Sequence, residues 1–244
     1  MTAPLFFVEP GALETDEVVL DGPEGRHAAK VRRLRNGELV DLADGSGVLA
    51  HCVVGAVAGE TLTLRVTERS QVPRPKPSFT VVQALPKGDR GELAVEVLTE
   101  VGVDVIMPWQ AARCVTRWTG DRGERAHQRW VAHAREAAKQ ARRARVPEVT
   151  PSVSTAQVAV RLSEAELAVV LHEGASDPLV SIELPRVGEV VLVVGPEGGI
   201  DDGELAIFLD AGARISRLGP EVLRTSTAGI AALSALIART PRWA

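Results

Sequence analysis

The sequence predicts two domains: a small N-terminal β-barrel or sandwich, then an α/β domain with a parallel sheet flanked by helices. Short apolar segments separated by glycine-containing turns fill the first seventy residues, a pattern typical of closely spaced strands. Prolines at positions 73, 75 and 77 favour an extended linker. Beyond them, strand and helix patterns alternate. We therefore expect a barrel over residues 1–72, a linker over 73–78 and an α/β domain over 79–244.

The strands expected in the first domain lie in the segments LFFV, EVVL, ELVDLADGSG, VLAHCVV and TLTLRV. Asp-Gly pairs at 21–22 and 44–45 mark turns beside them. In the second domain we expect a strand at 79–85, a helix at 90–102 and a strand at 103–109.

The segment from Gly123 to Arg145 has the composition of one long helix that stops before Pro147. Further strands are expected at 167–173, 189–199 and 213–220, each ending in a glycine-containing break. Because these strands are apolar almost without interruption, they are expected to be buried on both faces, as in a parallel sheet covered by helices.

Composition excludes several classes of protein. The chain has 244 residues, 45% of them hydrophobic, and a formal net charge of -4, which is typical of an ordinary globular protein. Its apolar segments are too short or too mixed to span a membrane, and its N-terminus lacks the pattern of a secretory signal, so we expect a cytoplasmic protein. Neither the two cysteines nor the five histidines have metal-ligand spacing, so no metal is expected.

Positive charge gathers in the middle of the chain. Residues 73–160 carry 14 basic and 9 acidic side chains, and the segment from Arg122 to Arg145 is the densest part. A second basic group lies in the segment RHAAKVRRLR at 26–35. A solvated charged face is the simplest explanation, whereas phosphate contact would make affinity for a polyanion fall steeply with salt.

The segment VVGPEGGIDDGEL, residues 193–205, places three glycines between a strand and the acidic start of a helix. It lacks the Lys-Ser/Thr pair of a phosphate-binding Walker loop and does not match GxGxxG. Both a ligand-binding loop and an ordinary strand-to-helix connection fit this pattern.

A second segment, RLGPEVLRTSTAG at 217–229, also follows a strand and leads into a helix. Since ligands of open α/β sheets bind at the carboxyl ends of strands, the two Gly-Pro-Glu loops predict one shared pocket. Thr225, Ser226 and Thr227 have helix capping as an alternative role. Arg224 is a candidate donor to a phosphate or carbonyl group, with an exposed solvated arginine as the alternative.

These motifs resemble those of the SPOUT class of S-adenosylmethionine (SAM)-dependent RNA methyltransferases. More narrowly, they are similar to those of the bacterial 16S ribosomal RNA uridine-N3 methyltransferases. The similarity rests on GPEGG and LGPEVLRT, and also on RHAAKVRRLRNGE, KGDRGELAVEVLTEVGVDVIMPWQAARC and REAAKQARRARVPEV, so it covers both domains.

The resemblance implies a PUA-like RNA-binding barrel at the N-terminus and a C-terminal domain tied in a deep trefoil knot. It also implies a homodimer without a metal, acting on 16S rRNA or the 30S subunit. SAM, the methyl donor, would lie among three loops, in contact with Leu171, His172, Glu173, Gly195, Pro196, Glu197, Gly198, Gly199, Leu218, Gly219, Pro220, Leu223 and Thr225. The expected RNA contacts are Arg26, Lys30, Arg32, Arg33, Arg113, Arg129, Arg142, Arg143 and Arg145.

The implied reaction is methylation of a uridine at N3, with Arg224 as the catalytic residue. Its guanidinium, assisted by Arg113 or Arg143, would stabilise negative charge on the uracil carbonyl oxygens. Many relatives have a glutamate where this chain has Ser226, so the acceptor of the N3 proton stays open. Val97 also replaces a lysine that is frequent in the family. Two alternatives are a noncatalytic ribosome-assembly factor that binds RNA and a SPOUT enzyme acting on a ribose 2'-hydroxyl or on tRNA.

Overall fold

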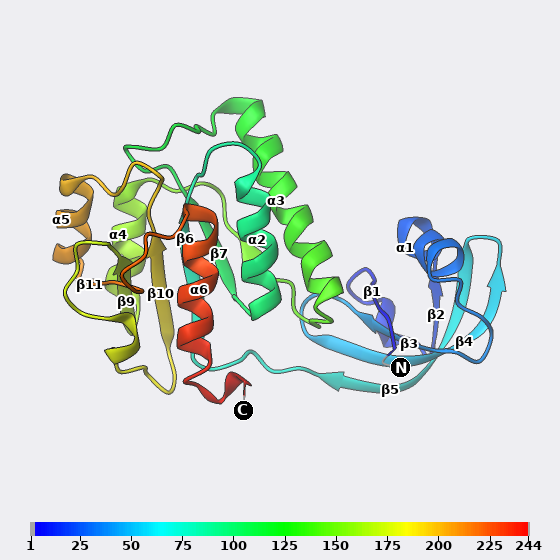
Figure 1. Ribbon diagram of the computed structural model, residues 1–244. Helices are drawn as coiled ribbons and strands as arrows, with labels where there is room; N and C mark the ends of the chain where they lie inside the picture. Colours follow the sequence, from blue (N-terminus) through cyan, green and yellow to red (C-terminus); the bar gives the residue numbers. More distant parts are fainter. Residues whose placement is uncertain (1–2, 244) are drawn as a thin grey trace. The chain divides into compact units, whose positions relative to one another are not determined.

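The computed structural model describes residues 3–243, which divide into two compact units. The first unit runs through Arg74 and also takes in residues 138–146, and the second contains the remaining residues (Figure 1). The chain therefore leaves the first unit, builds part of the second, and returns before completing it.

The first unit is built on a five-stranded sheet in the order β1-β3-β4-β5-β2. Its neighbouring strands are antiparallel except for the parallel pair β1 and β3. Inward-facing apolar side chains such as Val40, Leu42, Leu62 and Leu64 alternate with more exposed ones and form the core. The strands are β1 (Leu5–Phe7), β2 (Glu17–Leu20), β3 (Leu39–Ala43), β4 (Val48–Ala58) and β5 (Thr61–Gln71).

A helical segment lies between β2 and β3, where the sequence analysis placed no helix. It consists of α1 (Gly22–Arg26) and the single π-helical turn His27–Val31. Pro23 stands in the first turn, a position where its missing N–H costs nothing. This segment was not predicted because it is short and mixes small with charged residues, so it lacks the apolar periodicity by which longer helices are identified.

Helix α3 (Gly120–Gln140) ends five residues before the predicted end at Arg145. The backbone turns at Arg142, which has a positive φ of 56°. Ala138 and Ala144 are buried with apolar residues of β1 and β3 in a small core of the first unit. Burial of these two alanines, and not helix propensity, determines the path of the chain here.

The second unit contains a six-stranded sheet in the order β11-β9-β10-β6-β7-β8, in which every neighbouring pair is parallel. This confirms the predicted parallel sheet. Its strands are β6 (Ser78–Ala84), β7 (Val105–Trp109), β8 (Glu148–Val149), β9 (Leu167–Leu171), β10 (Glu189–Val194) and β11 (Arg214–Ser216).

Helices α2 (Arg90–Val101) and α6 (Thr225–Ile237) lie side by side, and α6 packs on β6 and β10 (Figure 1). Gly102 ends α2 in a left-handed conformation with φ 111°. Helix α4 (Thr155–Glu164), which the sequence analysis did not predict, packs against β9 and α5 (Asp202–Asp210). Short 3-10 turns occupy Ala12–Glu14, Leu179–Ser181 and Pro241–Trp243.

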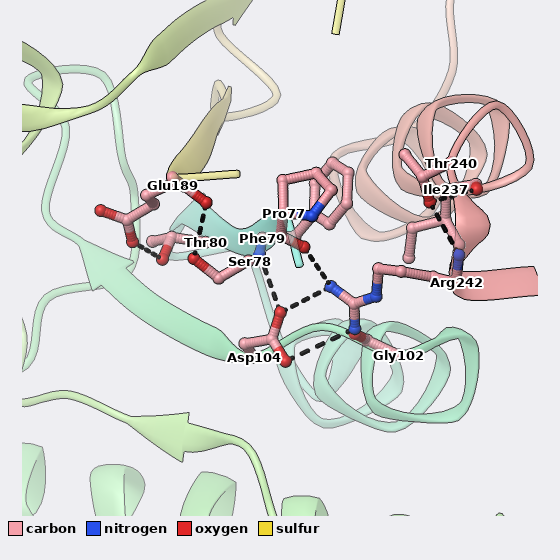
Figure 2. A network of polar contacts seen from close by, with 11 residues as sticks. Pro77, Ser78, Phe79, Thr80, Gly102, Asp104, Glu189, Ile237, Thr240 and Arg242 are labelled. Atoms are coloured by element: carbon pink, nitrogen blue, oxygen red, sulfur yellow. Dashed lines mark hydrogen bonds and ion pairs between the residues drawn. The ribbon is translucent and has the colours of Figure 1, made fainter. Parts of the chain in front are cut away.

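Arg242 joins several segments near the amino ends of β6 and β7 (Figure 2). Its guanidinium lies 2.7 Å from the Asp104 carboxylate and donates to the carbonyls of Gly102 (2.5 Å) and Pro77 (3.1 Å). Asp104 in turn accepts the backbone N–H of Phe79 at 2.8 Å. The turn after α6 is thereby tied to the start of the sheet, at the end opposite the candidate site.

Candidate functional site

A cavity of about 370 Å³ opens at the carboxyl ends of β9, β10 and β11. The lining comprises residues 171–173 at the end of β9, residues 194–200 other than 198 at the end of β10, and residues 217–225 after β11. Ala228 of α6 completes the lining. The structure thus brings both Gly-Pro-Glu loops to one cavity, at the sheet edge where ligands of α/β proteins bind.

Except for Gly198, each residue expected to contact the methyl donor lines this cavity, and so does Arg224. Several lining residues were missed by the sequence analysis, although most of them lie within or beside the two singled-out loops. They are Val194, Ile200, Arg217, Glu221, Val222 and Ala228.

Charged groups of both signs lie around the cavity. Glu173, Glu197 and Glu221 contribute carboxylates, and Arg217 and Arg224 contribute guanidinium groups. This set suits a ligand that itself carries both positive and negative charge, because each ligand charge finds a group of opposite sign.

The glycine-rich loop is held by its own backbone and by the helix that follows. Gly199 has a φ of 75° and donates its N–H to the Pro196 carbonyl at 2.9 Å. A Cβ at Gly195 would lie 2.8 Å from Cγ1 of Ile200, so a side chain there would displace the loop. Asp201 caps α5 by accepting the Gly203 N–H at 3.0 Å.

His172 has a defined hydrogen-bonding role at the end of β9. Its Nδ1 accepts the backbone N–H of Gly174 at 3.1 Å. A backbone N–H can only donate, so the proton of the neutral imidazole is on Nε2. In this geometry the neutral His172 offers a donor to the cavity it lines, and its acceptor nitrogen is already used.

Arg224 and Thr225 stand where the loop after β11 enters α6. Arg224 is exposed, and its carbonyl accepts the N–H groups of Thr227 (2.9 Å) and Ala228 (2.8 Å). Gln83, fully buried at the end of β6, donates to the Thr225 carbonyl at 3.2 Å. The backbone that carries the Arg224 side chain is therefore fixed by the first turn of α6 and by the sheet beneath it.

Most of the expected RNA contacts lie in the first unit. Lys139, which bonds Glu24 of α1 at 3.1 Å, brings the returning segment 138–146 beside the helical segment 22–31. The structure thus places two separate basic stretches in one unit: Arg26, Lys30, Arg32 and Arg33 from one, and Arg142, Arg143 and Arg145 from the other.

The guanidinium of Arg145 is engaged within the first unit. It donates to the Val72 carbonyl from Nε at 3.0 Å and from Nη2 at 2.7 Å, and also to the carbonyl of Ser46. Gly47, with φ 118°, leaves space for it, since a Cβ there would lie 2.3 Å from Nη2. Arg113 and Arg129 belong to the second unit, where Arg129 pairs with Glu92 at 3.3 Å.

Within residues 3–243, no cluster of three or more histidine, cysteine, aspartate or glutamate residues has an arrangement suited to a metal ion. Across the same residues, no helix combines the length and the apolar character needed to cross a membrane.

The fold and the site define a two-unit protein with a small-molecule pocket at the carboxyl edge of a parallel sheet and a separate β unit rich in exposed arginine. A model of the RNA methyltransferase domain matches residues 73–237, and a model of the RNA methyltransferase PUA domain matches residues 20–67. The chain therefore belongs to the family of RNA methyltransferases that carry a PUA domain, as the sequence resemblance predicted.

Named relatives align along nearly the whole chain. A protein of Mycobacterium bovis named ribosomal RNA small subunit methyltransferase E is 49% identical over 100% of this chain and 94% of its own length. A protein of the same name from Bacillus subtilis is 30% identical over 96% of each chain. A methyltransferase structure from Legionella pneumophila with bound SAM is 28% identical, with a TM-score of 0.85 over 98% of this chain and 99% of that one.

Proposed function

We propose that this chain transfers the methyl group of SAM to N3 of a uridine in the 16S rRNA of the small ribosomal subunit. The observation that carries the proposal is the cavity shared by the two Gly-Pro-Glu loops with Arg224 on its lining, in a chain of the RNA methyltransferase family. The names of the mycobacterial and Bacillus relatives support the small-subunit RNA as substrate.

The residues around the cavity fit SAM. Its volume of about 370 Å³ is in the usual range for small-molecule sites. SAM carries a sulfonium, an ammonium and a carboxylate, which match the carboxylates and guanidinium groups of the lining. The Legionella structure with bound SAM supports this donor. We assign the contacts with SAM to the residues that the resemblance implied and that line the cavity. Gly198 belongs to the same loop but is not on the lining, so we assign it a supporting role.

When bound, SAM supplies an electrophilic methyl group, and this chain's residues orient the acceptor towards it. Uridine N3 carries a proton at neutral pH, and its loss places negative charge on the uracil carbonyl oxygens. The Arg224 guanidinium, carried by backbone that is held at the start of α6, stabilises that charge by donating to a carbonyl oxygen. Positioning of the base supplies the rest of the acceleration.

In this geometry His172 is not placed to accept the proton from N3. The Nδ1 of His172 is occupied by the Gly174 N–H, and its Nε2 already carries a proton. Glu173, Glu197 and Glu221 are the carboxylates on the cavity lining.

We assign phosphate contacts to the exposed cations of the first unit. Arg26, Lys30, Arg32, Arg33 and Arg142 are exposed, and Arg143, which is half-buried, follows Arg142 in sequence. RNA affinity should therefore fall steeply with salt, and a flat salt response would refute this assignment.

The same proposal includes a homodimer in the cytoplasm and a trefoil knot in the second unit, both implied by the resemblance. Sedimentation equilibrium tests the dimer, since a monomer at micromolar concentration would contradict it.

The experiment is transfer of labelled methyl from SAM to 30S subunits, and separately to free 16S rRNA, prepared from cells that lack this gene. Label in 3-methyluridine is the expected result. Label in another nucleoside would refute N3 specificity. Absence of both transfer and SAM binding would favour the noncatalytic assembly factor.

The Arg224→Ala variant tests the catalytic assignment. Loss of a charge-stabilising donor costs about 100-fold or more in turnover, while SAM affinity should change little. Arg186→Ala, which removes an exposed arginine of the same unit, is the matched control and should keep wild-type turnover. Near-normal turnover of Arg224→Ala would refute the role of Arg224.

A further inference from the structure

The glycine-rich loop after β10 is contacted from outside by the loop after β7. Arg113 of the β7 loop donates from Nη1 to the carbonyls of Gly198 (3.3 Å) and Ile200 (3.4 Å). Its Nη2 lies 3.4 Å from the Asp201 carboxylate. One planar guanidinium therefore spans the end of the glycine-rich loop and the cap of α5.

Gly198 packs against this arginine. A Cβ at Gly198 would lie 3.2 Å from the Cβ of Arg113 and 3.5 Å from its carbonyl oxygen. Gly198 is also the one residue of the GPEGG motif that is not on the cavity lining. The missing side chain at this position therefore allows the close approach of Arg113.

A second connection runs in the opposite direction, from α5 to the β7 loop. Glu204, 7% exposed, accepts the backbone N–H of Ala112 and the Thr155 hydroxyl through Oε1, both at 2.8 Å. Its Oε2 lies 3.4 Å from the backbone N of Asp201. The Thr155 hydroxyl also accepts the indole N–H of Trp109, at 3.2 Å.

The two connections involve adjacent residues of the β7 loop, Ala112 and Arg113. Arg113 reaches from the β7 loop to the backbone of the glycine-rich loop, and Glu204 reaches back to the backbone of Ala112. Loops are the mobile parts of a fold, and hydrogen bonds from the side chains of a neighbouring segment to their carbonyls and N–H groups limit that motion.

We propose that Arg113 and Glu204 brace the glycine-rich loop in the conformation that binds the methyl donor, and that both are positioning residues. Arg113 thereby has a role at the SAM site in place of the RNA contact expected from the sequence. The inference rests on the proposed function, because it takes SAM as the ligand of the cavity.

The brace predicts that donor affinity depends on the shape of the Arg113 side chain and not on its charge alone. A lysine keeps the charge but has no planar fork to span two carbonyls and a carboxylate. A phosphate contact, in contrast, would be largely preserved by lysine, which acts there as a point charge.

The test measures SAM affinity by calorimetry, affinity for a 16S rRNA fragment at several salt concentrations, and the thermal midpoint, for full-length variants. Arg113→Ala and Arg113→Lys should both raise the Kd for SAM about 10-fold, as expected when about 1.4 kcal/mol is lost. Their RNA affinity and salt slope should match those of the control Arg186→Ala.

Thr155→Val and Glu204→Gln test the second connection with little change in volume. Each should raise the Kd for SAM several-fold, and their effects should not add to that of Arg113→Ala because all act on one loop. Glu204→Gln retains an acceptor, so it stays informative where Glu204→Ala fails to fold.

The brace would be refuted if Arg113→Ala changed the Kd for SAM less than twofold. Arg113 would instead be a phosphate ligand if Arg113→Ala lowered the RNA affinity and reduced the slope of log affinity against log salt by about one. In that case Arg113→Lys should restore the RNA affinity. Failure of the proposed function looks different. A wild-type chain that binds SAM but does not methylate 16S rRNA would refute the acceptor and leave the brace to be decided by the Arg113 variants, whereas a wild-type chain that does not bind SAM would refute both.

Discussion

Arg242→Ala should destabilise the second unit strongly, although Arg242 lies at the opposite end of the sheet from the cavity. The side chain of Arg242 is 6% exposed and that of its partner Asp104 is 15% exposed. Its guanidinium also lies over the ring of Phe79, 5.3 Å from the centroid. Three segments therefore depend on one buried cation (Figure 2).

The size of the effect follows from what the substitution leaves behind. Asp104 keeps the Phe79 N–H but loses its counter-ion, and the carbonyls of Pro77 and Gly102 lose this donor. Removal of one partner of a buried pair costs about 3–5 kcal/mol. Because Asp104 keeps one hydrogen bond, we expect about 3 kcal/mol, a large part of the roughly 5–15 kcal/mol that stabilises a typical protein.

Tryptophan fluorescence suits this measurement, because all four tryptophans belong to the second unit. Urea unfolding should show a lower midpoint for Arg242→Ala with an unchanged slope, and a smaller decrease for Arg242→Lys, which keeps the charge but not the fork. Arg186→Ala is again the control. If Arg242→Ala lowered the free energy of unfolding by less than about 1 kcal/mol, the Arg242–Asp104 pair would contribute no more than an ordinary surface salt bridge, and the reasoning would be refuted.

Three further predictions concern single groups. Burial raises the pKa of Asp44, but hydrogen bonds from the turn that follows it outweigh burial and leave the pKa below its usual value. Its contribution to stability is therefore present above about pH 3.9 and is lost as the pH falls through the lower folded value. Asp44→Asn should remove this part of the acid dependence, measured as urea midpoints by circular dichroism. Burial raises the pKa of the Cys52 thiol to about 11 and also raises the pKa of the Cys114 thiol. Iodoacetamide at pH 8 should therefore label both cysteines only after unfolding. Rapid labelling of the folded chain would contradict this prediction. Gly195→Ala should raise the Kd for SAM about 10-fold, since its Cβ would lie 2.8 Å from Cγ1 of Ile200, and an unchanged Kd would show that the loop adapts.

The parallel sheet was predictable because its strands are apolar almost without interruption, and this pattern arises from burial on both faces. The end of α3 was not predictable in the same way. Residues 138–145 have good helix propensity, yet Ala138 and Ala144 are buried beside β1 and β3, more than ninety residues earlier in the chain. Local propensity does not contain that contact.

The same distinction holds at the site. The two Gly-Pro-Glu loops carry local sequence patterns, and the rule that ligands bind at carboxyl ends of strands brings them together. The partners of Arg113 are 85 to 88 residues away in sequence, so its charge alone suggested an RNA contact. Arg242, far from any recognisable motif, gave no signal of its contact with Asp104.

The return of residues 138–146 to the first unit has a consequence for synthesis of the protein. The five strands of the first unit are translated first, yet their small core lacks Ala138 and Ala144, and Val72 lacks the guanidinium of Arg145, until the ribosome has passed Val146. At about 5–20 residues per second, the 72 residues from 75 to 146 take roughly 4–14 s to translate. During that interval Leu5 and Phe7 lack the two alanines that share their cluster, which leaves an incomplete apolar surface that a chaperone could cover. A fragment cut at the proline-rich linker would remain permanently in this unfinished state.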